Sequence, residues 1–577
     1  MSATSSPLPP EYPADYAAIV AERDQLRKSL QEAEGRHARL VEAYRAATEE
    51  LALLKQRLFV AKAERVDTTQ LQLEFEKKAE ALDALKGQLP SEESDVPPID
   101  TRRPAEKTPA PRKAPRGRRP VLELDLPLDR VEIPDPLFET LVSEGKATRT
   151  GFEESAQLAY KRGGLRRLII ARVKYEAVGR DGVREREVAA VPPSLVSRSL
   201  AAPSLLAHVI TEKFCDGLPL FRIEERFGRV GVPIDRGTLA RWVHGSGTGL
   251  GGVVVAMKKD AILRAFCIAT DATGISIQPE RHVPKPPRQP CRKGTFFTLV
   301  ADKDHVLFEY MARETSAGVR DLLKGFKGYV QADAKSVYDA FFTERIESGE
   351  APEGGPEVGC WVHGRRKFWE AAICKNAGGL EGLFRIRRLF QREATWTSRT
   401  PEERLRLRQE VLKPEVDAFF EWAEAEYKRL EHVRGLARSA FGYVVRQKGP
   451  LSTFLADGRL IMDNNRSERS LRPIRVGQKA WLFIGSGDHA VSAAIHFSLV
   501  ASARLHKLDP EAYLRDLIRV RPHWPDDRLL ELSPKYWSLT RARLASVQLA
   551  AEVGHLDVPE PLDTSGEPDR TAPTQPA

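Results

Sequence analysis

The sequence has few cysteines and no long apolar stretch, and both absences limit the kind of protein it encodes. Five cysteines occur among 577 residues, and no two of them form a C-x-x-C pair. An odd number of thiols without such spacing is typical of a reduced intracellular protein rather than a disulfide scaffold. No apolar run approaches the roughly 18 residues that span a bilayer, and the first residues lack a signal-peptide pattern. We therefore expect a soluble, cytoplasmic protein that does not contact membranes.

A strong excess of one charge is also missing. The chain has 90 Lys and Arg against 81 Asp and Glu, a net charge of +9 with a pI near 9.2. So modest an excess is only suggestive of a polyanionic partner such as the nucleoid DNA, but the basic residues crowd particular segments. At this length the chain is too long for one core and should divide into several domains.

Residues 1–89 are predicted to form an N-terminal coiled coil. Apolar positions there alternate steps of four and three, which is a heptad pattern. The seam consists of Leu26, Leu30, Ala33, His37, Leu40, Tyr44, Ala47, Leu51, Leu54 and Leu58. So narrow a stripe favours a parallel dimer with a second copy, and hence a homo-oligomer. The alternative is an intramolecular hairpin with a helix at Leu71–Leu85.

Two segments of different character follow the heptads. Residues 90–120 are rich in proline and charge and are predicted to be a disordered, extended linker. The basic end of this linker, 115–120, is either a minor-groove contact or a plain basic tether. Residues 121–199 are predicted to be a small mixed module. Because residues 121–195 contain neither cysteine nor histidine, we expect an apolar core there instead of a structural zinc site.

Residues 200–252 show a helix-turn-helix pattern. An apolar-striped helix is followed by a turn at Gly231–Pro233 and by a second helix that Asp235 should cap. The residues of the second helix expected to face outward and read DNA are Arg236, Thr238 and Arg241. Gly247–Gly252 matches G-x-G-x-x-G, but it follows a helix and no βαβ unit surrounds it, so we interpret it as a flexible joint.

Residues 253–500 alternate between strand-like and helix-like periods. Apolar runs at 265–271, 295–300 and 306–310 predict an antiparallel meander, and a helix at 316–326 leads to further strand-like runs at 328–333 and 358–362. Asp271 and Asp333 end two of these runs. The pattern indicates a ribonuclease-H-like mixed sheet with a basic helical insertion at about 376–455. Each aspartate taken alone is equally well a turn residue or a helix cap.

The stretch Met462–Arg475 places one carboxylate among several arginines. Asp463 or Asn464 should cap a helix that carries Glu468, and the flanking cations are Arg466, Arg469, Arg472 and Arg475. An acid among cations suits a metal ion held beside a polyanion. The alternative is a solvated helix with surface salt bridges.

The chain resembles the DDE transposases of the insertion-sequence-sixty-six group, the large TnpC-type protein. The resemblance covers nearly everything from the leucine-rich N-terminal helix to about Leu539. The matching blocks are 54–59, 218–222, 238–242, 270–273, 360–368, 463–469, 472–473, 481–486 and 508–537. One departure is that the family usually has a paired-cysteine zinc module where residues 121–199 stand here. The resemblance makes 501–540 a C-terminal family segment, and we expect residues 541–577 to be a disordered tail.

The resemblance implies that Asp271, Asp333 and Glu468 are the catalytic, metal-binding DDE triad. Carboxylates suit two Mg²⁺ ions, which Mn²⁺ can replace in vitro, and such ions support cleavage of DNA followed by strand transfer. The residues implied in contacts to DNA phosphates are His363, Arg365, Arg366, Arg466 and Arg469. The expected partners are transposon ends, target DNA and small companion proteins of the element.

Two other functions are compatible with the same residues. One is a catalytically silent DNA-binding protein or repressor that uses only the coiled coil and the helix-turn-helix. The other is a ribonuclease-H-like nuclease or resolvase that cuts DNA without joining strands. Retention of all three carboxylates argues against the first, and strand-transfer products would separate the second from a transposase.

Overall fold

The computed structural model is a multidomain mixed α/β protein. It describes residues 16–63, 77–82, 84, 126–161, 164–178, 184–279, 291–374 and 376–566. The chain divides into two compact units, each described here by itself. The helical unit comprises residues 1–110 and 361–448, and the core unit comprises residues 111–360 and 449–577. No helix among the described residues is long and apolar enough to cross a membrane.

The helical unit begins with a single long helix, α1 (Tyr16–Ala63). On the predicted heptad seam, Leu26 is 63% and Leu30 is 59% exposed. An ion pair between Lys78 and Glu50 joins α1 to the short helical stretch at 77–82. That contact is of the kind the hairpin requires, but most of 71–85 lies outside the described residues. The parallel dimer and the hairpin both stay predictions.

The rest of the helical unit is a bundle with an aromatic core. Its elements are α9 (Trp361–Ile373), α10 (Ala377–Ala394), α11 (Pro401–Leu407), a π-helix (Arg408–Leu412), α12 (Lys413–Arg429) and α13 (Leu436–Arg446). Trp361, Phe368 and Phe419 are almost completely buried, and the ring of Phe419 contacts the rings of the other two. The unit thus begins at Trp361, earlier than the predicted insertion at 376, because Trp361 starts a helix instead of ending a strand.

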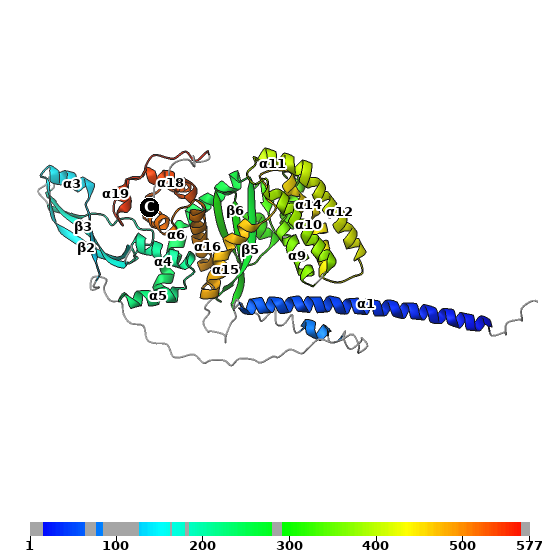
Figure 1. Ribbon diagram of the computed structural model, residues 1–577. Helices are drawn as coiled ribbons and strands as arrows, with labels where there is room; N and C mark the ends of the chain where they lie inside the picture. The colour runs from blue at the N-terminus through cyan, green and yellow to red at the C-terminus, as the bar shows by residue number, and fades with distance from the viewer. Residues whose placement is uncertain are drawn as a thin grey trace, which may run out of the picture. The chain divides into compact units, whose positions relative to one another are not determined.

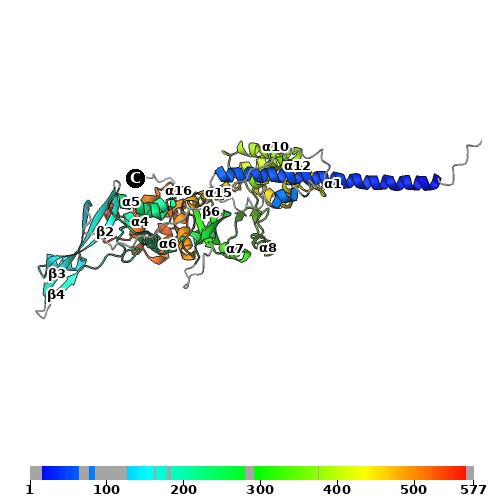
Figure 2. The same cartoon turned by 90° about the horizontal axis from the view of Figure 1, so that it is seen from below.

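The small module at the start of the core unit is built on a long hairpin, which projects from α4–α6 in Figure 2. Its elements are β1 (Leu128–Ile133), α3 (Pro136–Ser143), β2 (Ala147–Lys161), β3 (Gly164–Val178) and β4 (Arg184–Val188). Strand β3 pairs with β1 in parallel and with β2 and β4 antiparallel. Val173, Tyr175 and Ala189 are buried against Phe138 and Val142, so the module does have an apolar core. The linker at 90–120 lies outside the described residues.

Three helices follow the module: α4 (Pro203–Phe214), α5 (Leu220–Arg229) and α6 (Arg236–Arg264). The pair α5–α6 has the predicted helix-turn-helix pattern, and the Asp235 carboxylate accepts hydrogen bonds from the backbone of Gly237 and Thr238. The predicted joint at 247–252 is wrong, because α6 continues through it. A Cβ on Gly247 would lie 2.6 Å from Cβ of Ser492, so the glycine permits close packing of two helices.

A five-stranded mixed sheet forms the middle of the core unit (Figure 1). Its elements are β5 (Cys267–Ile277), β6 (Arg292–Ala301), β7 (His305–Met311), β8 (Tyr329–Gln331) and β9 (Glu357–Val358), with α7 (Ser316–Leu322) and α8 (Asp339–Glu347) between strands. The order is β7-β6-β5-β8-β9. Strands β5, β6 and β7 are antiparallel, whereas β8 is parallel to β5 and to β9.

Strand β5 is longer than predicted. Asp271 lies in its middle and not at its end, because Thr273 and Gly274 continue the pairing with β6. The final strand is shorter than the apolar run at 358–362, since it stops at Val358.

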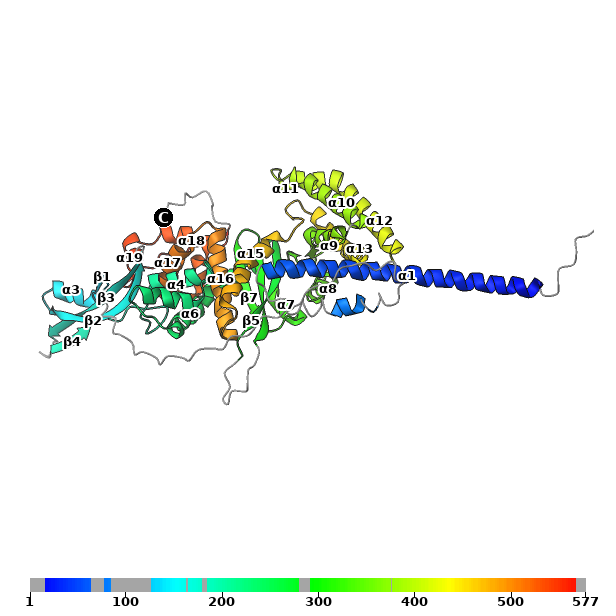
Figure 3. The same cartoon turned by 60° about the horizontal axis from the view of Figure 1, so that its bottom comes forward.

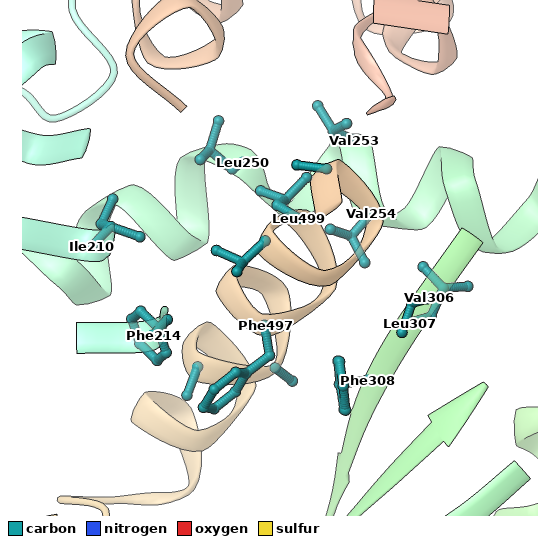
Figure 4. Packing of buried hydrophobic residues seen from close by; sticks show 14 of the residues in the cluster. Ile210, Phe214, Leu250, Val253, Val254, Val306, Leu307, Phe308, Phe497 and Leu499 are labelled. Atoms are coloured by element: carbon teal, nitrogen blue, oxygen red, sulfur yellow. The ribbon is translucent and has the colours of Figure 1, made fainter. Parts of the chain in front are cut away.

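Helices from the C-terminal third complete the core unit, and α15 and α16 among them pack against the sheet. They are α14 (Lys448–Ser452), α15 (Asn465–Trp481), α16 (Gly487–Leu505), α17 (Pro510–Val520), α18 (Pro534–Ala542) and α19 (Ser546–Ala550), with short 3₁₀ turns at 453–455, 521–523 and 526–532. Helix α16 packs against β7 and α6 (Figure 3). Figure 4 shows Phe497 of α16 between Phe214 of α4 and Phe308 of β7 in the shared core.

The predicted disordered tail is wrong for residues 541–566. Leu549 and Leu556 are buried in the main apolar cluster. Arg519 donates to the carbonyl of Gly554, and Arg528 donates to that of Pro559, at 2.9 and 2.8 Å. Guanidinium donors, one buried and one half-buried, and apolar contacts therefore fix this segment; the rest of the predicted tail, 567–577, lies outside the described residues.

Candidate active site

Asp271 faces the side of the sheet that α15 covers. It pairs directly with Thr298 of β6, and residues directly opposite each other in an antiparallel pair point to the same face. The Thr298 hydroxyl lies 2.8 Å from that of Ser470 on α15. Asp271 is half-buried, and its carboxylate accepts a hydrogen bond from the backbone of Ala272 at 2.7 Å.

Asp333 follows the strand that neighbours β5. In the parallel pairing of β5 with β8, Ala269 is the partner of Gln331. Two residues further along each chain stand Asp271 and Asp333, so the register directs them to the same edge region. Lys335 lies 3.7 Å from the Asp333 carboxylate.

Tyr338 lies buried beside Thr270, the residue that precedes Asp271. Burial raises the pKa of Tyr338, and the negative charges of Asp333 and Asp271 raise it further, against a hydrogen bond with Thr270 that lowers it. The Tyr338 hydroxyl is 3.2 Å from that of Thr270. Tyr338 is therefore a neutral hydrogen-bonding neighbour of the strand that carries Asp271.

The start of α15 is tied to β5 beside Asp271. Asn464 is completely buried, and its side-chain amide donates to the carbonyl of Thr270 at 2.8 Å. Its backbone N–H points at the sulfur of Cys360, 3.3 Å away. Glu468 is half-buried one helical turn later, where its N–H donates to the carbonyl of Asn464. The residue next to Asp271 therefore sets the position of the turn that carries Glu468.

Carboxylates are suitable ligands for hard divalent cations. In this structure, however, Asp271, Asp333 and Glu468 are not close enough together to form a complete metal centre. Among the described parts of the chain, no three His, Cys, Asp or Glu side chains lie close enough together to hold one ion. The register brings Asp271 and Asp333 together, and Glu468 belongs to the helix over them.

The arginines of α15 are exposed. Arg466 and Arg469 line an open cleft of about 560 Å³ together with Lys303 and Arg504. Apolar side chains such as Phe308, and the carboxylate of Asp302, also line the cleft. The four cationic side chains, two of them on the helix that carries Glu468, outnumber this one carboxylate and form a surface suited to an anionic polymer.

His363, Arg365 and Arg366 lie on α9 of the helical unit, whereas the three carboxylates lie in the core unit. Both arginines are exposed and His363 is half-buried. The helical turn that holds them is packed through Gly364, whose Cβ position lies 3.2 Å from Val444. They thus form one short basic stretch on a helix and not at a strand end.

The predicted recognition helix presents two of its three residues outward. Arg236 and Arg241 are exposed, but Thr238 is only 9% exposed, so its predicted outward position is wrong. It stands beside the buried Leu239 in the first turn of α6. The Thr238 hydroxyl accepts a hydrogen bond from the Arg241 guanidinium at 2.8 Å, which orients Arg241.

The sequence of this chain matches models of known protein families. Residues 198–492, more than half of the chain, match the family described as "Transposase IS66 family". The chain belongs to this family. The matched region spans α4 to the start of α16 and so includes all three carboxylates. Residues 498–534 match the "IS66 C-terminal element", and residues 46–133 match "Transposase C of IS166 homeodomain".

Curated relatives of this IS66-family chain come from Sinorhizobium fredii (strain NBRC 101917 / NGR234). Uncharacterized protein y4hP is 31% identical over 61% of this chain and 65% of its own length. Uncharacterized protein y4qI is 27% identical over 74% and 78%, and uncharacterized protein y4jD is 25% identical over 57% and 64%. The chain thus spans slightly less than two thirds of the length of two of these relatives.

Sequence reasoning missed one residue of this IS66-family site and left two roles open for another. Asn464 was predicted either to cap its helix or to orient the groups around the carboxylates; its side chain makes no capping hydrogen bond and instead donates to Thr270 of β5. Tyr338 precedes α8 and had no local signal, because its role depends on strand register. The signal for Asn464 was its place four residues before Glu468, on the same helical face.

Proposed function

We propose that this chain is the transposase of a bacterial insertion sequence, binding the ends of the element and catalysing metal-dependent cleavage and strand transfer of DNA. The observation that carries the proposal is the register of β5 with β8, which directs Asp271 and Asp333 to one region beneath the helix of Glu468. The strand order and directions support assignment of the sheet to the ribonuclease-H-like class.

The three carboxylates are proposed as ligands of Mg²⁺, with Mn²⁺ as a substitute. Two such ions would activate the attacking oxygen and stabilise the leaving oxygen of an in-line displacement. Their residue types fit, and two of the three are neighbours by register. Because the three do not yet converge, the proposal requires Glu468 to approach the aspartates when DNA and metal bind. Asn464 would set the pivot for that approach.

The remaining residues are proposed to hold the DNA. The first proposed contact is between the phosphates of the DNA backbone and the four cationic side chains of the cleft. Of these four, Arg466 and Arg469 are nearest to Glu468 along the chain. His363, Arg365 and Arg366 would supply a second phosphate contact from the helical unit. Arg236 and Arg241 would contact the element ends from α6, with Thr238 orienting Arg241.

The same proposal covers assembly and location. Exposed seam residues such as Leu26 and Leu30 support self-association through the N-terminal part of α1, whereas Glu50 further along the helix pairs with Lys78. We propose a homo-oligomer that acts on nucleoid DNA in the cytoplasm, with small proteins of the same element as companions.

A second function is favoured by one observation. Because no three acidic or imidazole groups among the described residues form a metal-binding cluster, a catalytically silent DNA-binding protein would share the same surfaces. It would retain the helix-turn-helix and the basic cleft and would lack cleavage.

A strand-cleavage assay separates these functions. The substrate is labelled DNA from an element end, with Mg²⁺ present or absent, and the wild type is compared with Asp271→Asn. Metal-dependent nicking lost in the variant supports the transposase, and joined products exclude a nuclease that only cuts. A matched control is Asp488→Asn, an exposed acid at the start of α16 that should leave nicking unchanged. DNA binding without nicking by the wild type would support the silent protein.

A further inference from the structure

The turn after α15 has a strained backbone at a bulky residue. Leu482 has φ 64° and ψ −47°, and the N–H of Phe483 donates to the carbonyl of Trp481 at 2.7 Å. An i to i+2 hydrogen bond around a residue with positive φ and negative ψ defines the rare, strained form of the γ-turn. For a non-glycine residue with a large side chain this conformation is an outlier that the surroundings must impose.

Hydrogen bonds on both sides impose it. The N–H of Leu482 completes the last turn of α15 by donating to the carbonyl of Gln478 at 2.8 Å. Immediately after the turn, Ile484 pairs with the end of β5: its N–H donates to Ser276, and its carbonyl accepts from Gln278. The backbone of Leu482 and Phe483 is therefore held between the end of α15 and the end of β5.

The strained turn presents apolar side chains to solvent. Leu482 is 64% and Phe483 is 43% exposed. A glycine at 482 would make the same turn without strain, so a leucine there costs stability twice, through backbone conformation and through exposed apolar surface. Strain together with exposed apolar surface indicates that these side chains bind another molecule.

The surface around the turn is cationic. Arg475 and Lys479 on the last turns of α15 are exposed, and so is Lys293 of β6, which pairs with Ser276 beside the anchor of Ile484. Apolar residues raised on a rigid turn among cations fit a DNA duplex, because the cations hold phosphates while Leu or Phe enters between base pairs.

We propose that Leu482 and Phe483 form an apolar wedge that enters the stack of the bound DNA and unstacks one base step. This inference rests on the proposed function, because it takes the DNA as the substrate of the carboxylate site. Glu468 lies in the first turn of α15 and Leu482 directly follows the helix, 14 residues further along, or about 21 Å at 1.5 Å per residue. The wedge therefore deforms DNA at a fixed distance from the cleavage site and helps to set which phosphate reaches it.

The test uses the full chain and a short duplex selected from a random library by its binding to the wild-type protein. Copies of the duplex carry 2-aminopurine at successive positions, because its fluorescence rises when it is unstacked. The variants are Leu482→Gly, Leu482→Ala and Phe483→Ser. The matched control is Leu263→Ser, which removes a residue of the core unit that is 80% exposed outside the turn.

We expect a several-fold rise in fluorescence at one step with the wild type and with the control. The three wedge variants should bind the duplex but lose most of that rise. Leu482→Gly should also unfold at a urea concentration at or above that of Leu482→Ala, because glycine removes the backbone strain and alanine does not. This order distinguishes a strained wedge from a residue that merely supports the fold.

Several outcomes overturn the wedge. If the variants retain the rise, or the wild type cleaves DNA without unstacking any step, the wedge is wrong and the proposed function stands. If the variants change the oligomeric state and not the DNA stack, the turn contacts protein instead. If the wild type selects no duplex and cleaves no DNA, the proposed function fails and the wedge fails with it.

Discussion

Two alanine substitutions in α6 should change stability in opposite directions. Glycine inside a helix costs about 1 kcal/mol relative to alanine, so a flexible glycine-rich segment would be stabilised by either change. At Gly251 the nearest atom to a new Cβ is the Ile495 Cδ1 at 3.4 Å, an ordinary contact. Gly251→Ala should therefore stabilise the core unit by roughly 0.5–1 kcal/mol.

Gly247 lies against the neighbouring helix. A Cβ there would be 2.6 Å from Cβ and 2.9 Å from Cα of Ser492, and these atoms can recede only if α16 moves. Overpacking of this kind costs about 1–3 kcal/mol. Because the propensity gain is the same at both sites, the overpacking cost is the expected difference between the two variants, and Gly247→Ala should be the less stable.

Urea denaturation, followed by tryptophan fluorescence, measures both variants against the wild type. The difference is taken from the unfolding midpoints at a common slope. If Gly247→Ala is as stable as Gly251→Ala, α6 and α16 are not packed through Gly247 and the flexible joint is the better description.

Three further predictions concern the site and its support. Glu468→Gln should abolish strand cleavage and leave the gel-shift affinity for DNA nearly unchanged; loss of both would mean that Glu468 holds the structure of α15. Burial lowers the pKa of His496 to about 4, while its ring N–H donates to the carbonyl of Val243. The unfolded chain takes up this proton first, so stability should fall with pH below about 6.5, by roughly 2 kcal/mol from about pH 7 to about pH 5. His496→Gln should lessen that fall in urea denaturation, and an unchanged pH dependence would assign it to other groups. Arg241→Ala should weaken binding to element ends more than to random DNA, whereas equal weakening would make Arg241 a phosphate contact.

Local signals in the sequence predicted the local parts of the fold. The turn at Gly231–Pro233 and the cap at Asp235 needed only neighbouring residues, and the structure has both. The prediction that the Thr238 side chain faces outward failed because the first turn of α6 also buries a polar residue beside its apolar ones. The glycines at 247–252 were misinterpreted because Ser492, their packing partner, is distant in sequence.

The candidate site depended on information that no single stretch contains. Asp271 and Asp333 were recognisable as residue types near strand ends, but their proximity follows from the pairing of Ala269 with Gln331. The burial of residues 541–566 could likewise not be predicted, because the polar composition of this segment resembles that of a disordered one. Its partners, Arg519 and Arg528, come from earlier helices.

If Asp271 holds a catalytic metal ion, as proposed, a change of ligand chemistry at this position should change which metal supports cleavage. In Asp271→Cys a thiolate replaces a carboxylate, and a thiolate is a poor ligand for Mg²⁺ but a better one for the softer Mn²⁺. Strand cleavage by wild type and variant would be measured in each metal. We expect the wild type to cleave in both and the variant to cleave only with Mn²⁺. Equal cleavage by the variant in Mg²⁺ would contradict a metal ligand at Asp271 and with it the proposed mechanism.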